Sequence, residues 1–401
     1  MKTVMNVLVL AIAMLFVMTS AAADWPNWRG PNHDGISTEK DWNPEALKKD
    51  VKKIRNVNVG DGYSMVAVKD GKVYTMGNKD EKDSVYCLDE ATGKELWKYS
   101  YPCGKGSYPG PRSTPTVDGD MVYAVSREGD VFCLKASDGS VVWKKNVIKD
   151  YGAENIGWGI ACSPRVYGNG LIINAGINGI MLNKKNGEKV WASEAGKGGY
   201  STAVVYQKGD KHCAAIFGQK AMYGVDLKSG KQLWSFPWET SYDVNAADPI
   251  VVGDLVFLSS GYGRGCAVID ISGTEAKEVW QNKEMCNQFS SSVYIDGYIY
   301  GISGNAGKGD LKCLDMKTGK VKWSHDSGFG ALMAADGKLI ILNEKGELSI
   351  AEATPTAYKE LSQAKVLDPK GAKCWNMPVL SNGKIYCRDS KGDLVSIDVS
   401  K

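Results

Sequence analysis

The sequence has almost no net charge. Its 401 residues include 49 lysines and arginines and 46 aspartates and glutamates, which gives a formal net charge of +3. No Lys/Arg-rich tract concentrates positive charge in one segment. Proteins that bind nucleic acid through their phosphates need such a concentration. The composition therefore argues against a nucleic-acid partner.

Patterns that hold metals or nucleotides are also missing. The chain has three histidines, and none has a cysteine or histidine at the spacing of zinc ligands: His33, His212 and His325. The stretch "GKGGYST" (196–202) lacks the G-K-[ST] ending of a phosphate-binding loop. The stretch "GYGRGC" (261–266) lacks the final glycine of a dinucleotide fingerprint and is expected in a β-hairpin. We predict no metal site and no nucleotide site.

Long apolar runs are absent beyond the first residues. Residues 4–18 are nearly all apolar, follow Lys2 and lead into Ser20-Ala21-Ala22-Ala23, which is the pattern of a cleavable secretory signal peptide. The run is shorter than the roughly 20 residues of a membrane-spanning helix. No cysteine follows it closely to carry a lipid. We therefore predict a signal peptide over residues 1–23, a periplasmic or secreted location and no membrane anchor.

None of the ten cysteines is adjacent to another. Cys87, Cys133 and Cys313 occupy equivalent places in an internal repeat, where other copies have Met, Gly, Val or Ser, so they indicate small packing positions. Four others fall in or beside connecting loops: Cys103, Cys162, Cys286 and Cys374. One or two disulfides among these four remain open, because the sequence alone does not pair them.

A repeat in the chain predicts its fold. Motifs such as "LDEATGKELW" (88–97) and "LDMKTGKVKW" (314–323) recur, and their tryptophans are 43 to 48 residues apart: Trp97, Trp143, Trp191, Trp234, Trp280 and Trp323. Each unit contains four short alternating runs rich in Val, Thr, Tyr or Phe, separated by turn residues, and no helix-length amphipathic segment. A period in the forties with four strands per unit is typical of a β-propeller.

The turn that recurs in the repeats also explains one misleading motif. Lys317-Thr318-Gly319 matches a triplet of serine acylating enzymes, and Ser37-x-x-Lys40 matches their other half. Thr318-Gly319, however, falls at the hairpin between the third and fourth strands, as Thr92-Gly93 does in the first repeat. Glycine supplies the positive φ that a tight hairpin needs. We interpret the triplet as a turn.

Counting the repeats gives an all-β, eight-bladed β-propeller of four-stranded antiparallel blades. The seventh repeat lacks the tryptophan and has "AKVLD" (364–368) in its expected place, and the eighth ends after three strands. Residues 51–59 have strand character and no partner of their own. We predict that this N-terminal strand completes the last blade and closes the ring. The expected organisation is a signal peptide (1–23), an N-terminal anchoring segment (24–50) and a monomeric propeller (51–401).

At these residues the chain resembles the propellers of the pyrroloquinoline-quinone (PQQ) repeat superfamily. That superfamily includes BamB-type outer-membrane assembly factors and quinoprotein alcohol dehydrogenases. The resemblance rests on the "TGK-x-x-W" repeat, and also on "WPNWRGPNHDGIS" (25–37) and "GWGIACSP" (157–164). It implies that the six repeat tryptophans pack between blades as structural docking residues. The paired cysteines and calcium site of the dehydrogenases have no counterpart in the sequence, nor does the lipidated cysteine of the assembly factors.

The loops that precede the inner strands should gather on one face around the central channel. They bring aromatic, basic and acidic residues together in an expected funnel for a ligand or partner: Tyr63, Tyr108, Arg112, Trp158, Tyr200, Tyr242, Asp243, Asp248, Phe289 and Trp375. Aromatic rings and arginine suit binding; the alternative is that the rings plug the channel. Asp243 and Asp248 share a loop that could bind calcium, although solvated carboxylates are the simpler interpretation. Trp25 and Trp28 are expected to anchor the N-terminal segment, or to contact a partner.

These observations favour an exported, non-catalytic binding or scaffold protein, BamB-like in shape, that presents the funnel to a protein or polymer partner. The sequence assigns no catalytic residue and no cofactor under this interpretation. One alternative is a PQQ-dependent quinoprotein dehydrogenase that oxidises alcohols with PQQ and calcium. Another is a carbohydrate-binding propeller.

Overall fold

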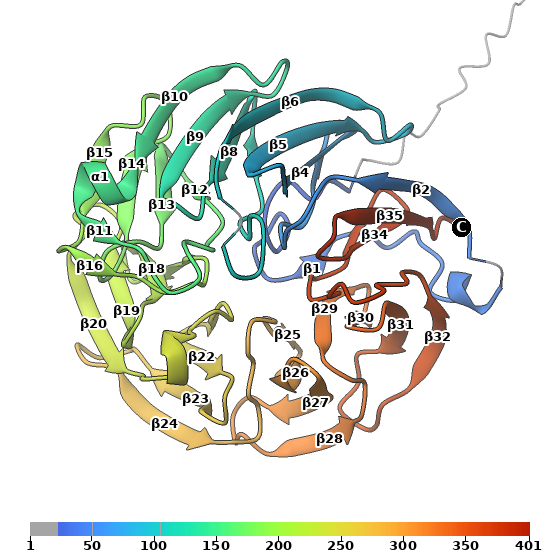
Figure 1. Ribbon diagram of the computed structural model, residues 1–401. Helices are drawn as coiled ribbons and strands as arrows, with labels where there is room; N and C mark the ends of the chain where they lie inside the picture. The colour runs from blue at the N-terminus through green and yellow to red at the C-terminus, as the bar shows by residue number, and fades with distance from the viewer. Residues whose placement is uncertain (1–22, 50, 105) are drawn as a thin grey trace, which may run out of the picture.

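The computed structural model describes residues 23–49, 51–104 and 106–401. Eight sheets, each containing four antiparallel strands from one blade, form a closed ring (Figure 1). The predicted eight-bladed β-propeller is confirmed. The predicted signal peptide lies outside the described residues except for Ala23. Among the described residues, no helix is long and apolar enough to cross a membrane.

The strands of each blade follow one another from the channel outward. Blade 1 contains β3 (Ala67–Lys69), β4 (Lys72–Lys79), β5 (Lys82–Asp89) and β6 (Glu95–Pro102); blade 2 contains β7 (Thr116–Asp118), β8 (Met121–Val125), β9 (Asp130–Lys135) and β10 (Val141–Asn146); blade 3 contains β12 (Arg165–Tyr167), β13 (Gly170–Ile173), β14 (Ile180–Asn183) and β15 (Lys189–Ala192); blade 4 contains β17 (Val204–Lys208), β18 (Lys211–Phe217), β19 (Ala221–Asp226) and β20 (Gln232–Pro237).

The second half of the ring repeats this order. Blade 5 contains β21 (Ile250–Val252), β22 (Leu255–Ser260), β23 (Gly265–Asp270) and β24 (Lys277–Asn282); blade 6 contains β25 (Val293–Ile295), β26 (Tyr298–Asn305), β27 (Lys308–Asp315) and β28 (Val321–His325); blade 7 contains β29 (Gly330–Ala335), β30 (Lys338–Asn343), β31 (Glu347–Glu352) and β32 (Glu360–Lys365); blade 8 contains β33 (Val379–Ser381), β34 (Lys384–Arg388), β35 (Asp393–Asp398) and β2 (Lys53–Asn58). The connections add α1 (Val147–Tyr151), the 3-10 turns η1 (Ala46–Lys48) and η2 (Ser241–Asp243), and the short strands β1 (Ile36–Ser37), β11 (Ala153–Glu154) and β16 (Gly196–Lys197).

The two ends of the propeller sequence meet in blade 8. Strand β2 pairs with β35 in antiparallel register, so the predicted closure by an N-terminal strand is confirmed. The fully buried Arg388 ties this blade to blade 1, because its guanidinium donates hydrogen bonds to the carbonyl oxygens of Ser64 (2.6 Å), Met76 (2.6 Å) and Gly60 (3.0 Å). Closure leaves each blade with a neighbour on both sides.

The repeat tryptophans lie on the outer strands, at the junctions between blades. Five donate the indole Nε1–H to a carbonyl of the next blade: Trp97 to Ala136, Trp143 to Lys184, Trp191 to Leu227, Trp280 to Met316 and Trp323 to Thr354. Trp234 instead donates to the Tyr206 hydroxyl within its own blade.

The hairpin glycine of the next blade makes room for four of these rings, those of Trp97, Trp143, Trp191 and Trp280. Gly187 has φ +72°, and a Cβ at that position would lie 2.7 Å from the Trp143 ring. Gly139 is placed in the same way against Trp97. The glycine of the repeated motif therefore serves both the turn and the contact between blades.

The seventh blade departs from the predicted alignment. Strand β32 places Ser362 opposite Ile350, at the register position that tryptophan holds in other blades, so assigning "AKVLD" to that position was wrong. The connection from β28 to β29 is short, residues 326–329, so Ser362 follows Trp323 by 39 residues, whereas the repeat tryptophans are 43 to 48 residues apart. Ser362 donates a hydrogen bond to the Pro44 carbonyl (2.6 Å), and Leu47 is buried in the neighbouring core. The N-terminal segment thus fills a junction that has no tryptophan.

That segment crosses the ring opposite the loop connections that precede the inner strands. Trp25, 1% exposed, pairs its backbone with Val68 of blade 1, and β1 adds to β29 of blade 7 as a parallel strand. The Arg29 guanidinium donates to the Ser292 carbonyl of blade 6 (2.8 Å). These contacts fix the segment to distant blades at once.

All ten cysteines, which lie within the described residues, are free thiols, and nine are buried. Burial raises the pKa of Cys87 and Cys133 to about 11 and that of Cys162 to about 12. A buried thiol with a raised pKa is a poor nucleophile. The repeat cysteines act as small apolar side chains, as their alternation with Met, Gly and Val predicts.

This arrangement predicts the thiol count. An aromatic disulfide reagent should react quickly with at most the partly exposed Cys286 in the folded protein, and with all ten cysteines after denaturation without a reductant. The Cys286→Ser variant should lose the fast phase. A denatured count that falls short by two or four thiols would contradict the structure and show disulfides.

Candidate functional site

A chain of hydrogen bonds connects the inner edges of neighbouring blades around the channel. Each backbone N–H donates to a side chain of the next blade, two residues before the inner strand of that blade. The bonds run from Met65 to Thr114 (3.0 Å), from Thr114 to Ser163 (3.0 Å), from Ser163 to Thr202 (2.9 Å), from Thr202 to Asp248 (2.7 Å) and from Asp248 to Ser291 (2.9 Å). Asp248 is the one carboxylate among these acceptors.

Asp248 connects the ring to the N-terminal segment. Its Oδ2 accepts a hydrogen bond from the Trp28 indole (2.6 Å) and lies 3.9 Å from Nε of Arg29. Burial raises the pKa of Asp248, while the charge of Arg29 and the hydrogen bonds from Thr202 and Trp28 lower it. Trp28 is therefore held beneath the channel by a buried carboxylate.

The structure separates Asp243 from Asp248. The Asp243 carboxylate accepts a hydrogen bond from Gln219 (2.7 Å) and pairs with Lys220 (3.0 Å). Among the described residues, no group of three or more His, Cys, Asp or Glu side chains is placed to hold a metal ion. The shared loop does not bring the two carboxylates to one site.

A cavity of about 240 Å³ opens at the centre of the loop face. Eight of the ten expected funnel residues line it: Tyr63, Tyr108, Arg112, Trp158, Tyr200, Asp248, Phe289 and Trp375. The other two, Tyr242 and Asp243, lie outside the lining. Trp28 is also part of the lining, so the N-terminal segment closes the floor while the rings leave the funnel open above it.

Two groups of aromatic side chains form the sides of the funnel. The Trp375 wall consists of Trp375 with Tyr63, Tyr108 and Phe289, whose ring centroids lie 5.6, 6.0 and 5.0 Å from its own. It comes from blades 1, 6 and 8 and the loop between blades 1 and 2.

The Trp158 wall comes from the opposite side of the ring. It consists of Trp158 with Tyr200 (6.1 Å) and Tyr242 (6.4 Å), and Tyr262 packs edge-on against Tyr242 (5.3 Å). Offset and edge-on ring contacts of this kind stabilise each wall without a ligand.

Arg112 lies at the edge of the cavity between these walls. Its guanidinium lies over the Tyr63 ring (5.8 Å) and donates to the carbonyls of Gly110 (3.1 Å) and Tyr108 (3.0 Å). Burial raises the pKa of Tyr63 in one wall and of Tyr200 in the other, and the positive charge of Arg112 opposes that rise in both. The arginine is therefore close to both walls.

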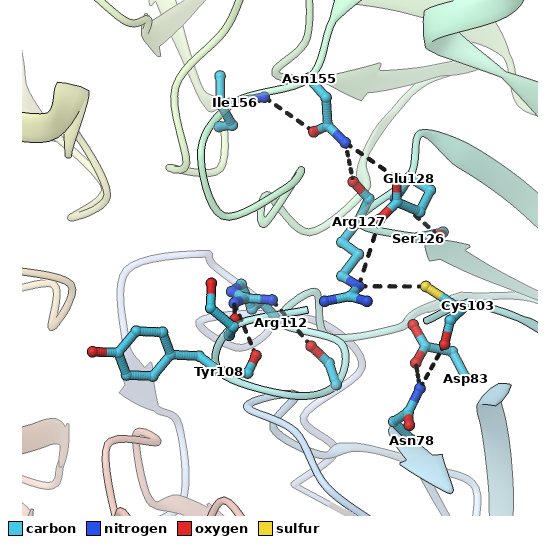
Figure 2. A network of polar contacts seen from close by, with 12 residues as sticks. Asn78, Asp83, Cys103, Tyr108, Arg112, Ser126, Arg127, Glu128, Asn155 and Ile156 are labelled. Carbon is cyan, nitrogen blue, oxygen red and sulfur yellow. Dashed lines mark hydrogen bonds and ion pairs between the residues drawn. The ribbon is translucent and has the colours of Figure 1, made fainter. Parts of the chain in front are cut away.

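A buried network holds the loop that carries Arg112 (Figure 2). Asn78 donates hydrogen bonds to Asp83 (2.6 Å) and to the Cys103 carbonyl (3.0 Å), and Arg127 donates to the Cys103 sulfur (3.4 Å). Burial raises the pKa of Asp83, which is 0% exposed. Figure 2 shows the guanidinium groups of Arg112 and Arg127 near one another. Burial and repulsion from Arg127 both lower the pKa of Arg112.

Several residues of the lining were not among the predicted funnel residues. Trp28 was expected only in the anchoring segment, and the others are Tyr262 and the polar residues Ser163, Thr202, Gln288 and Asn376. The recurrence of Ser, Thr or Asp two residues before the inner strand was a usable signal for the chain of hydrogen bonds around the channel. No local sequence pattern identifies Trp28 as a lining residue, because its hydrogen-bond partner Asp248 is 220 residues away in the chain.

Comparison with known proteins places the chain in a family. Residues 81–325 match the family model described as outer membrane protein assembly factor BamB. The chain belongs to this family. One curated relative, the outer membrane protein assembly factor BamB of Salmonella typhimurium, is 24% identical over 330 residues, which cover 78% of this chain and 80% of the relative.

Solved structures share the fold of this BamB-family chain. The quinohemoprotein alcohol dehydrogenase of Comamonas testosteroni superposes with a TM-score of 0.73 at 14% identity, covering 94% of this chain and 80% of that one. BamB from Moraxella catarrhalis superposes with a TM-score of 0.62 at 13% identity, covering 87% and 98%. These likenesses confirm the propeller.

The lining of this BamB-family funnel does not fit a quinone held with calcium. Among the described residues, Asp248 is the one carboxylate in the lining, and both of its oxygens already accept hydrogen bonds. No cysteine is part of the described lining. Calcium prefers six to eight oxygen ligands, several of them carboxylates.

Proposed function

We propose that this chain is an exported, non-catalytic binding and scaffold protein that holds a protein partner, or another polymer, at its aromatic funnel. Its family supports this proposal, because the relative compared above is named as an assembly factor. The predicted signal peptide, together with a relative named as an outer membrane protein assembly factor, supports a periplasmic or secreted location. The propeller serves as a rigid platform for the loop face.

The rim of the funnel carries the proposal. Tyr108, Tyr242 and Tyr262 all have left-handed backbones, with φ of +58°, +61° and +55°. Tyr108 is 50% exposed and Tyr242 is 71% exposed. Non-glycine residues in this region cost about 1–3 kcal/mol each and are concentrated at functional sites. Three strained tyrosines around one cavity therefore suit contact with a partner.

Tyrosine is also well suited to that contact. It offers a large ring at a low cost in side-chain entropy and is enriched where partners make their strongest contacts. The two walls add rings that are already packed, so a partner loses little free energy in ordering them. We infer that the tips of both walls, together with the cavity between them, form the contact surface.

A photocrosslinking experiment tests this proposal. A benzophenone amino acid in place of Tyr242 should crosslink one recurring partner in the cells that make the protein, because this side chain is the most exposed of the rim. The same amino acid in place of Val190, 50% exposed on the outer strand β15, is the matched control and should give no such adduct.

The variant Trp158→Ala decides whether the adduct depends on the funnel. It removes the ring on which Tyr242 packs, and we expect the adduct to disappear while the protein remains folded. The proposal fails if the Tyr242 position gives no adduct, or if adducts at Val190 are as abundant and Trp158→Ala changes neither.

The dehydrogenase and carbohydrate alternatives have separate tests. We expect PQQ with calcium to cause no saturable rise in melting temperature and no dye reduction with simple alcohols, since the lining does not fit that pair. A saturable rise with turnover would replace the proposal by the dehydrogenase. A rise with neutral oligosaccharides would replace it by a carbohydrate-binding propeller.

A further inference from the structure

Arg112 carries a positive charge at the funnel that no carboxylate of the described residues neutralises by an ion pair. Its hydrogen bonds go to main-chain carbonyls of its own loop, at Gly110, Ser107 and Tyr108. These bonds leave two of its five N–H donors without a partner among the described residues. The other charge in the lining, Asp248, is already balanced by Arg29.

The loop fixes the arginine in place. The three carbonyls hold one edge of the guanidinium, and the Tyr63 ring lies beside it at 5.8 Å. A guanidinium fixed in this way gains more from an anion than a mobile surface charge does, because little side-chain freedom is lost on binding. Repulsion from nearby Arg127 also makes an anion at this position favourable.

The size of the cavity limits what enters it. Pockets that hold drug-sized ligands have volumes of about 300–1,000 Å³, and this cavity is smaller, at about 240 Å³. One large side chain with an adjacent carboxylate fits such a space better than a whole cofactor or several sugar rings do. The walls of stacked rings suit an aromatic or apolar side chain.

We propose that the ligand of the funnel is an acidic segment of the partner protein, in which a carboxylate pairs with Arg112 and a neighbouring aromatic side chain enters between the Trp375 wall and the Trp158 wall. This inference rests on the proposed function and adds the chemistry of the partner. Arg112 selects for charge, and the two walls supply contact area.

Two matched peptides test the preference for an acidic segment on the purified mature protein. Acetyl-Gly-Trp-Asp-Trp-Gly-amide and its Asn counterpart have nearly the same shape and differ by one charge. Titration calorimetry should show the Asp peptide binding at least about tenfold more tightly, the gain expected from one charge-assisted hydrogen bond. Raising the salt concentration should reduce the difference.

Variants assign this preference to Arg112. Arg112→Met keeps the apolar stem, so the Asn peptide should bind as before while the preference for Asp disappears. Arg264→Met is the control, because Arg264 stacks on Trp238 outside the lining and should leave the preference intact. Melting curves confirm that both variants fold, and the Asp/Asn comparison on the unchanged protein needs no variant.

The outcomes separate this inference from the proposed function. Equal affinity for both peptides, or binding of neither, overturns the acidic segment, while the crosslink at Tyr242 still decides the binding role. Tighter binding of tetragalacturonate, lost in Arg112→Met, would assign the funnel to an acidic polysaccharide instead. Saturable, Arg112-dependent binding of PQQ alone would assign it to a small carboxylated ligand.

Discussion

Replacing Asp248 with alanine should lower the free energy of unfolding by about 3–5 kcal/mol. The side chains of Asp248 and Arg29 are both 3% exposed, so the substitution leaves a buried guanidinium without its counter-charge. It also removes the acceptor of the Trp28 indole and of the Thr202 amide. Urea unfolding followed by tryptophan fluorescence measures the loss.

A second substitution shows whether the unpaired charge causes that loss. The double variant Arg29→Met with Asp248→Ala should be more stable than Asp248→Ala alone, because no buried charge then remains unpaired. Asp41→Ala is the control, since it removes an exposed carboxylate 3.1 Å from Lys401 and should change stability by less than about 1 kcal/mol. Equal losses for Asp248→Ala and Asp41→Ala would contradict the role of the buried pair.

The sequence contained enough information for the propeller because its signals are local and repeated. The distance from each hairpin glycine to the next tryptophan is set within one blade, and six copies make the period visible. Residues 51–59 were predicted to complete blade 8, because an unpaired strand at one end and a missing strand at the other imply closure, and β2 does so over 53–58. Alternation within a strand predicts its buried side.

The sequence was less informative where contacts depend on distant segments. The seventh blade has no tryptophan to mark its outer strand, and the short connection between β28 and β29 places Ser362, the equivalent residue, a few positions before the predicted one. The floor of the funnel could not be predicted either, because it depends on a contact between Trp28 and Asp248, which are 220 residues apart in the chain. Backbone strain places Tyr242 at the rim, and a buried hydrogen-bond network holds the loop of Arg112 at the cavity. Neither feature produces a periodic pattern in the sequence.

Replacing Trp143 with alanine should cost about 3–5 kcal/mol, as expected for truncating a buried aromatic side chain. Trp143 is 8% exposed and packs on Gly187 of the next blade. Its Nε1–H donates to the Lys184 carbonyl (2.9 Å), which would lose that partner. Because Gly187 has no side chain to move into the space, the gap between blades 2 and 3 would stay open.

Graded substitutions distinguish this contact from a general effect on the strand. Trp143→Phe loses the hydrogen bond but keeps most of the ring, so it should cost clearly less than alanine. Trp280 makes the equivalent bond to Met316 but is more exposed, so Trp280→Ala should cost less than Trp143→Ala. Val142→Ala, at a neighbour that is 41% exposed, should change little. If Trp143→Ala melts like the unchanged protein, the ring does not stabilise the junction, and the packing of blades rests on their inner strands instead.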